Sequence, residues 1–445
     1  MRVMPVSLLP SAVAVLACFA ALPSQAETLK EVYEIARTYD ATYLGARAQA
    51  ESVGYKVAQA DSAFLPTVGL TGSVSHNVSD TPVGGVRKVE TAMVGINASQ
   101  PLLNRGNWLN ADKASKSLEI AQADLDSAEQ DLIVRTAQAY FDVLSAQEAV
   151  NTAQAAKKAI SEQLASAKRN FEVGTATITD TREAQARFDL STAQLLGAEN
   201  DLRTKQLALD QLVGRSGVKP QPLAQPVTLP MLADGQADDW ASKAEQAAPV
   251  RKARTAYDIA KLETSRTEAG HWPTLSLDGS LSSTNNRGNT PTAAQLMGGD
   301  GTSTNAKIGL TLNVPLYAGG AISNQSREAV KLEEKARDDY EGARRAVAQG
   351  TRQAYFGVQS GQAQIQALEA AESSSKLALE ATQLGYKVGV RVNLDVLNAQ
   401  TQLYSTQRDL AKARHDVLVA SLKLRQASGT LAPADVDNVD KLIAR

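Results

Sequence analysis

Four segments of the chain alternate between apolar and polar residues. The first, at 67–75, places Val68, Leu70 and Val74 on one face and mostly Ser and Thr on the other. A period of two predicts β-strands with one apolar and one polar face. Each segment has about ten residues, enough for a tilted strand to cross a bilayer. The other three segments are 90–100, 274–281 and 305–314.

The polar faces of these segments consist mainly of Ser, Thr and Asn rather than of charged residues. That composition is expected of a strand face that lines a water-filled lumen. An amphipathic sheet on a soluble core would show the same alternation, and this alternative remains open at this point. Prolines stand where a strand can begin or end, at Pro66, Pro101, Pro273 and Pro315.

Two longer regions have the pattern of helices. Neither proline nor glycine occurs from Asn107 to Val173, and apolar or small residues recur there mostly three or four positions apart. A helix of that length spans about 100 Å at 1.5 Å per residue. Gly174 is a residue type that commonly ends a helix, and a second helix at about 179–213 is predicted to return from it.

The second half of the chain repeats this pattern. A run from about 322 to 388 stops at Gly389, and a return helix is predicted at 394–427. Each half therefore predicts a long antiparallel hairpin whose seam is rich in small residues. A soluble coiled coil would look the same over these segments, so the helices alone do not decide the function.

The two hairpins belong to an internal duplication. Residues 139–147 return at 354–362 and residues 171–174 return at 386–389, both at an offset of 215 residues. We therefore predict two tandem structural repeats. The predicted organisation is a signal peptide at 1–26, a first repeat at 27–220 (strands at about 66–101, hairpin at about 107–213), a Pro-rich linker at 221–236, a second repeat at 237–431 (strands at about 273–315, hairpin at about 321–427) and a C-terminal tail at 432–445.

The N-terminal segment has the features of a secretory signal peptide. Arg2 precedes an apolar stretch, and the small residues Ser24 and Ala26 form a cleavage site. Cys18 is the only cysteine, and its surroundings loosely resemble a lipoprotein box, so it is either acylated or removed. We favour cleavage after Ala26, because cleavage at Cys18 would leave a short apolar core. The mature chain then has no disulfide.

Composition and motifs exclude several classes of function. The formal net charge is −2, which does not attract nucleic acid. No apolar run after the signal peptide approaches the ~20 residues of a transmembrane helix. His76, His271 and His415 lack metal-ligand spacing, and no nucleophile motif or phosphate-binding loop occurs. We expect no enzyme, cofactor, metal site or nucleic-acid partner.

The strands themselves demand an assembly. Four strands cannot close a barrel, and an open edge in lipid leaves backbone groups without hydrogen bonds. Strands must therefore be pooled between chains, and a trimer would supply twelve.

These features together resemble the TolC family of outer-membrane efflux and secretion ducts. The resemblance covers nearly all of the mature chain, and its most specific piece is the stretch 386–391 followed by 394–397. It is also carried by the duplication, the two Val-Gly turns, the strand-to-helix corners at 101–103 and 315–320, and Gly429-Thr430-Leu431 after the last helix.

The resemblance implies a fold and a set of partners. The fold is mainly helical with a membrane β-barrel portion: a homotrimer whose twelve-stranded barrel contacts outer-membrane lipid and continues into a periplasmic tunnel of twelve helices. The partners are a periplasmic adaptor (membrane fusion) protein and an inner-membrane ABC or resistance-nodulation-division transporter, which supplies the energy.

The resemblance also implies roles for residues at the helical turns. Tyr386 and Arg391 match residues that bond to the other hairpin near Thr179 and Asp180 and hold the tunnel closed. Asp395 matches a carboxylate that narrows the pore. The residues implied to dock the adaptor are Val173, Gly174, Thr175, Val388, Gly389 and Val390.

A simpler role is open for two of these residues. Asp180 and Asp395 follow turns, where Asp caps helices, and Asp180 stands at capping-box spacing from Glu183. Both roles can hold together. A second carboxylate, which some family members carry one helical turn after the first, is Asn398 here. A single ring of charge is therefore expected.

We therefore expect an outer-membrane exit duct that passes proteins or small toxic compounds from an inner-membrane pump through the periplasm to the outside. The sequence around the second helical turn, Tyr-x-Val-Gly-x-Arg at 386–391 followed by Asp-Val-Leu at 395–397, favours the branch of the family that serves type I secretion and multidrug pumps. One alternative is a duct dedicated to a resistance-nodulation-division drug or metal pump. An alternative of another class is a periplasmic coiled-coil scaffold without a pore.

Overall fold

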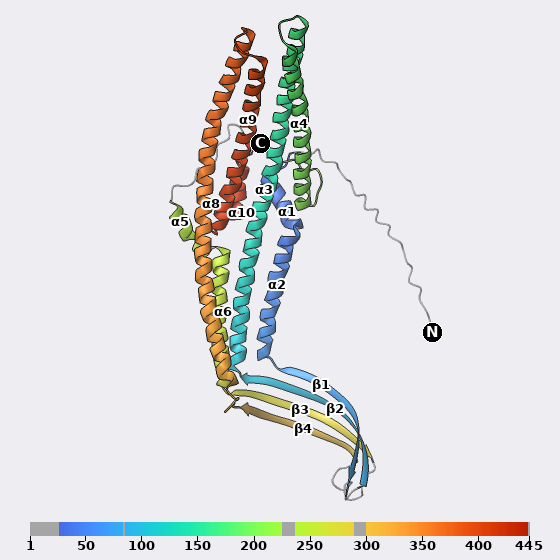
Figure 1. Cartoon of the computed structure of the whole chain (residues 1–445). Coiled ribbons are helices and arrows are strands. Elements are labelled where there is room, and N and C mark those ends of the chain that lie inside the picture. Colours follow the sequence, from blue (N-terminus) through green and yellow to red (C-terminus); the bar gives the residue numbers. More distant parts are fainter. Residues whose placement is uncertain (1–25, 83–84, 225–235, 289–299, 444–445) are drawn as a thin grey trace, which may run out of the picture.

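The computed structural model describes residues 26–82, 85–224, 236–288 and 300–443. Long helices stand on a four-stranded sheet that curves away from the helical axis, and two helical hairpins form the opposite end (Figure 1). The predicted signal peptide, except Ala26, and most of the predicted linker at 221–236 lie outside the described residues.

The predicted strands are confirmed, and each is longer than the alternating segment that predicted it. All pairs are antiparallel, in the order β1-β2-β3-β4. Within the described chain β1 and β4 each have one partner strand, so the sheet has two unpaired edges. The strands are β1 (Thr67–Thr81), β2 (Gly85–Leu103), β3 (Thr274–Gly288) and β4 (Gly301–Asn313).

The register places most apolar residues of the four strands on one face; Val89 and Met93 of β2 are exceptions. Leu70 lies opposite Ile96, Ile96 opposite Leu281, and Leu281 opposite Ala306, so these residues form one row across the sheet. Residues in such a row point to the same side. The predicted division into an apolar and a polar face is therefore confirmed. Leu310, on the apolar face, is 65% exposed in the single chain.

The four long helices begin and end within two residues of the predicted bounds. Gly174 and Gly389, which follow the two outgoing helices, have φ of +79° and +82°, a conformation that glycine adopts without strain. The first hairpin is α3 (Arg105–Glu172) and α4 (Ile178–Val213), and the second is α8 (Ala321–Lys387) and α9 (Asn393–Ala427).

Several shorter helices precede the strands or follow the hairpins, and the sequence patterns above do not predict them. α2 buries only Tyr43, Ala50 and Val53, so its apolar pattern is too sparse to stand out. These helices are α1 (Leu29–Tyr39), α2 (Ala41–Asp61), α5 (Ala237–Lys243), α6 (Ala248–Glu268) and α10 (Pro433–Asp440), with 3-10 turns η1 (Ser62–Phe64), η2 (Ala244–Gln246) and η3 (Ala269–His271).

The helices lie four abreast, as the strands do. Next to the sheet the neighbours run α2-α3-α6-α8, and towards the hairpin turns they run α4-α3-α9-α8 (Figure 1). The order α2-η1-β1-β2-α3-α4 returns as α6-η3-β3-β4-α8-α9. The exact bounds of the two repeats stay a prediction.

The main apolar core lies about halfway along the helices. It joins α1, α3, α9 and α10 through fully buried side chains such as Leu132, Phe141, Leu418 and Leu422. The predicted tail at 432–445 contains α10, which packs on this core through Val436 and Val439. Among the described helices, none combines the length and the apolar character that a membrane span requires.

Candidate functional site: the two helical tips

The first tip, residues 173–177, is a tight turn between α3 and α4. Gly174 takes the left-handed conformation, and the backbone N–H groups of Thr175 and Ala176 donate to the carbonyl of Asn170 at 2.8 and 3.1 Å. The Thr175 hydroxyl donates to the same carbonyl at 3.1 Å. These bonds satisfy the end of α3 and fix the direction in which the chain returns.

Asp180 belongs to the cap of α4, but not in the predicted position. The N-cap is Thr177, whose hydroxyl accepts from the Asp180 N–H at 3.2 Å while the Asp180 carboxylate accepts from the Thr177 N–H at 2.9 Å. The predicted box beginning at Asp180 is therefore wrong by three residues. The turn at Gly174 brings Thr177, rather than Asp180, to the start of the helix.

The second tip, residues 388–392, has the same geometry. The N–H groups of Val390 and Arg391 donate to the carbonyl of Gly385 at 2.9 and 3.1 Å. The Asp395 carboxylate accepts from the N–H of Val392 at 3.4 Å and lies 3.6 Å from the Arg391 guanidinium. Both contacts are long, so Asp395 is held loosely within its own chain.

Three side-chain hydrogen bonds join the two hairpins near the tips. The amide of Asn170 donates to the Tyr386 hydroxyl at 3.1 Å, and Arg187 Nη2 donates to Asn398 Oδ1 at 2.9 Å. Gln163 on α3 donates to Asn393 on α9. Beneath them Leu397 packs against Ile160, Leu164, Ala167 and Ala184.

The structure brings only some of the predicted gate residues together. Tyr386 reaches the first hairpin at Asn170, whereas the bonds of Asp180 lie within its own cap. Arg391 pairs with Asp395, and Thr179 is exposed. Bonds from Tyr386 and Arg391 to Thr179 and Asp180 are thus not formed within this single chain, and the gate stays a proposal.

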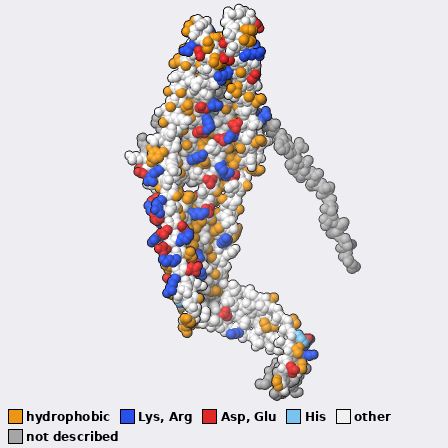
Figure 2. Space-filling view, in the orientation of Figure 1, with side chains coloured by type: hydrophobic (Ala, Val, Ile, Leu, Met, Phe, Trp, Pro, Cys, Tyr) orange, Lys and Arg blue, Asp and Glu red, His pale blue; other side chains and the backbone are white. Residues whose placement is uncertain are grey.

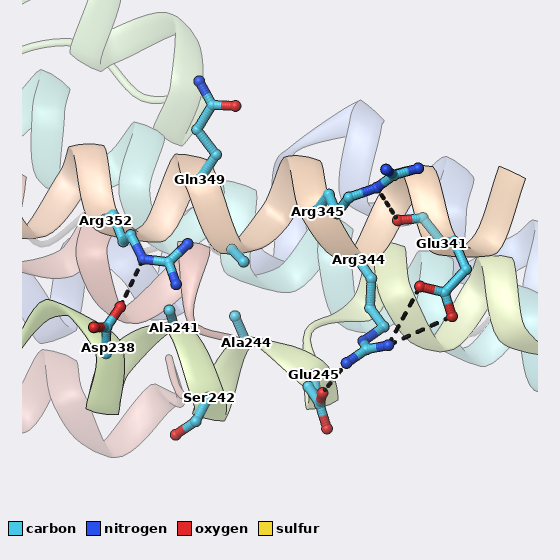
Figure 3. Close-up of a pocket in the computed structure, with 11 residues that line it drawn as sticks. Asp238, Ala241, Ser242, Ala244, Glu245, Glu341, Arg344, Arg345, Gln349 and Arg352 are labelled. Carbon is cyan, nitrogen blue, oxygen red and sulfur yellow. Dashed lines mark hydrogen bonds and ion pairs between the residues drawn. The ribbon is translucent and has the colours of Figure 1, made fainter. Parts of the chain in front are cut away.

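A cavity of about 760 Å³ lies halfway along the helices, between the segment α5-η2 and α8 (Figure 3). Arg352 bonds to Asp238 at 2.8 Å, and Arg344 pairs with Glu245 at 3.0 Å and with Glu341. The charges of these groups are paired, so the cavity attracts neither sign of ligand strongly. Over the described residues, no group of three or more His, Cys, Asp or Glu side chains could hold a metal ion.

Comparison with known proteins decides the family. The profile of the family described as "Outer membrane efflux protein" matches residues 32–215 and 240–430. The chain belongs to the outer membrane efflux protein family. The predicted resemblance and the predicted location in the outer membrane are thereby confirmed.

Relatives and solved structures of this family agree with that assignment. The chain is 35% identical to the outer membrane protein TolC of Vibrio cholerae over 93% of both chains. It is 31% identical to the alkaline protease secretion protein AprF of Pseudomonas aeruginosa, over 79% of this chain and 73% of AprF. The open-state MtrE outer membrane channel of Neisseria gonorrhoeae has the same fold, with a TM-score of 0.74 at 21% identity over 91% of this chain and 90% of MtrE.

The tips of this efflux-family chain end in exposed apolar side chains. Val390 is 79% exposed and Val388 66%, and Val173 is similarly open. Gly174, Thr175 and Gly389 are also exposed. Clusters of large exposed apolar residues are typical of contact surfaces, and the two tips lie together at the end farthest from the sheet (Figure 1).

Several residues that bond between the hairpins are not among those predicted from the sequence: Asn170, Arg187, Gln163 and Asn393. A signal was present for two of them, because Asn393 and Gln163 interrupt otherwise apolar seam positions close to the turns. Which partners they would meet depends on how α9 is rotated against α3, and a single helix pattern does not contain that information.

Proposed function

We propose that this chain forms the exit duct of a tripartite export system. Three copies would close a twelve-stranded barrel in the outer membrane and continue as a twelve-helix tunnel through the periplasm. The duct is passive and has no catalytic activity, and an inner-membrane pump supplies the energy. The observation that carries the proposal is the two-faced sheet with two open edges, joined directly to helices about 100 Å long.

The sheet edges favour assembly over a lone chain. β1 and β4 each present a row of backbone groups without a second strand in the described chain. In lipid such groups need partners, and pairing β4 of one chain with β1 of the next satisfies both edges. Because the chain supplies four strands, three copies give a ring of twelve.

The flanks of the helical layer favour the same assembly. α4 and α8 lie on opposite flanks near the tips (Figure 1) and carry exposed leucines, among them Leu196 and Leu207 on α4 and Leu377 and Leu384 on α8. We expect α8 of one chain to pack against α4 of the next. The apolar area of both flanks would then be removed from water.

The surface of the sheet fits a membrane barrel. In Figure 2, the side of the sheet that is turned to the viewer carries few charged side chains. Along α8 near the sheet, by contrast, Lys and Arg alternate densely with Asp and Glu. On the polar face, Ser, Thr and Asn predominate, and Asp278 bonds to Ser99 and Ser276 at 2.7 and 2.8 Å. Such a face suits a water-filled lumen.

The gate is proposed for the tips. Tyr386 and Arg391 would hold the closed state through bonds to Thr179 and Asp180 of the other hairpin, including that of a neighbouring chain. Arg391 is free to do so, because its contact with Asp395 is long and its side chain is 61% exposed. Three copies of Asp395 would form one ring of negative charge near the closed end.

The partners are proposed from the tips and from the relatives. The exposed residues Val173, Gly174, Thr175, Val388, Gly389 and Val390 would dock a periplasmic adaptor, behind which an ABC or resistance-nodulation-division transporter stands. The name of AprF refers to protease secretion, and BepC of Brucella suis, 30% identical, is an efflux protein. This pair of relatives supports a duct for type I secretion and multidrug export.

Insertion into planar lipid bilayers tests the duct against a scaffold. Purified mature protein should need detergent for extraction and should form water-filled pores that conduct ions. A periplasmic scaffold would dissolve in buffer and give no conductance. Absence of pores from a protein with the correct fold would overturn the proposed duct.

A further inference from the structure

The contact between the two hairpins changes in character along its length. Halfway along, α3 and α9 share an apolar core through residues such as Leu132, Leu418 and Leu422. Nearer the tips, Gln163 of α3 bonds to Asn393 of α9, and Gln400 follows Asn393 by seven residues, on the same face of α9. We call this part the amide seam and define it by these three residues. Leu397 lies between the two α9 amides and packs on α3 and α4.

The amide seam contains buried polar atoms without partners. Asn393 is 2% exposed and Gln400 5%. Among the described residues, Nδ2 of Asn393 and Oε1 of Gln400 have no hydrogen-bond partner. Exchanging the amide oxygen and nitrogen of Asn393 does not remove the deficit, because its bond with Gln163 satisfies one of its two polar atoms and leaves the other. A buried amide atom without a partner destabilises the packed state.

The seam inside the second hairpin is different. α8 and α9 meet through Val358, Ile365, Leu410 and Val417, which are all apolar and buried. Thr406, one heptad before Ala413 of the same cluster, is buried but satisfied by bonds within α9. α8 and α9 are thus joined there by apolar side chains, whereas the contact between α9 and the first hairpin includes unsatisfied buried amides near the tip.

We propose that Asn393 and Gln400 are positioning residues that set how readily the second hairpin leaves the first at the tips. When α9 moves away from α3, water reaches both amides and satisfies them, so separation removes the penalty that docking imposes. Leu397 packs on α3 and α4 and so holds α9 in one position against the first hairpin when the two are docked. This inference rests on the proposed function, because it concerns the opening of the proposed gate.

Hydrogen exchange of the α9 amides near the tip tests this directly in the full assembled protein. Gln400→Leu, and the double variant Gln163→Leu with Asn393→Leu, should each slow exchange in the first turns of α9 by about tenfold, because each removes an unsatisfied buried polar atom without leaving a bonded amide unpaired. The matched control Thr406→Val, on the α8 side of the same helix, should leave that exchange unchanged. Asn393→Leu alone should slow exchange less than the double variant, because it leaves the Gln163 amide without its partner.

Channel recordings provide the second readout. In a background that opens the gate, Tyr386→Phe with Arg391→Ser, Gln400→Leu and the double variant should each lower the conductance towards the closed level. Unchanged or faster exchange in both Gln400→Leu and the double variant would overturn the inference, because it would mean that the amides do not destabilise the docked state. Should the unaltered protein form no pores at all, the proposed duct fails, while the exchange experiment still decides the role of the amide seam.

Discussion

The side-chain amide of Asn170 donates a hydrogen bond to the phenolic oxygen of Tyr386 at 3.1 Å, which joins the two hairpins of one chain close to their tips. Asn170 lies four residues before Gly174, and Tyr386 three residues before Gly389. The two glycine turns are thus tied together by a bond between the helices that lead into them.

The first prediction concerns this bond. A neutral hydrogen bond of this kind contributes about 0.5–1.5 kcal/mol, and one to a charged group about 1.5–3 kcal/mol. Tyr386→Phe combined with Arg391→Ser should therefore loosen the tips and raise single-channel conductance in planar bilayers. Asn170→Ala, which removes the partner of the Tyr386 hydroxyl, should reproduce the share of the rise in conductance that is due to Tyr386→Phe.

Two results would separate the possible partners of Tyr386. Asp180→Ala should raise conductance only if Asp180 also bonds across the hairpins in the assembly, since within the chain it caps α4. Unchanged conductance in the Tyr386/Arg391 variant, with the oligomer intact, would leave only the capping roles.

The second prediction concerns the two faces of β4. Leu310 lies opposite Leu277 on the apolar face, and Thr311 lies opposite Ser276 on the polar face. Leu310→Arg should destabilise the folded barrel by about 2–4 kcal/mol per chain, because it places a charge in lipid. Thr311→Arg is the matched control and should be far milder. Equal effects of the two substitutions on unfolding in detergent or lipid would mean that the lipid-facing and lumen-facing sides of β4 are wrongly assigned.

The third prediction concerns Asp395. If three copies surround the axis, their charge attracts cations, and Asp395→Ala should lower the cation preference of the pore. Since the bond of Asp395 to the Val392 N–H and its ion pair with Arg391 are long, at 3.4 and 3.6 Å, stability should hardly change. A capping role alone predicts a loss of about 1 kcal/mol with selectivity intact. Reversal potentials in a salt gradient, with a melting curve beside them, distinguish these outcomes.

The fourth prediction concerns pH. His415 is buried between α9 and α3, with Nδ1 2.8 Å from Ser145 Oγ and its ring stacked on Phe141. Burial lowers the pKa of His415 to about 4; the charge of Asp416 raises the pKa by a smaller amount, and that of Arg414 lowers it further. The unfolded chain keeps the usual histidine pKa of about 6.5 and so binds more protons between pH 6.5 and 4.

Stability should consequently be complete above pH 6.5 and fall as the pH drops, by about 3 kcal/mol per chain at pH 4. His415→Gln keeps a polar group near Ser145 but cannot titrate. Melting temperatures of both proteins between pH 7 and 4 should diverge by that amount. Parallel curves would show that His415 does not contribute to the acid sensitivity.

Much of the fold could be predicted because its elements are long and regular. Apolar and polar residues alternate along the strands, which identified them. α3 contains no proline and only one glycine, Gly106, in its first turn, so its helical period could be recognised in the sequence. α2 was missed because few of its residues are buried and Gly45 and Gly54 interrupt it. The capping box of α4 was misplaced because Thr177 and Asp180 are both good capping types, and only the geometry of the preceding turn chooses between them.

The candidate site was predicted less completely than the fold. Tyr386 and Arg391 could be named from a resemblance, but Asn170, Arg187 and Asn393 could not, because bonds between hairpins depend on the rotation of one helix against another. That rotation decides whether Tyr386 faces Asn170 or Asp180. Periodicity along one helix does not fix that angle.

The central claim is that three chains pool their strands into one closed barrel, and the mass of the native protein in detergent tests it most directly. Purified mature protein, with the detergent contribution subtracted, should have three times the mass of one chain, because closing β1 against β4 of a neighbour removes both sheet edges. A stable, folded monomer would contradict the barrel and the duct with it.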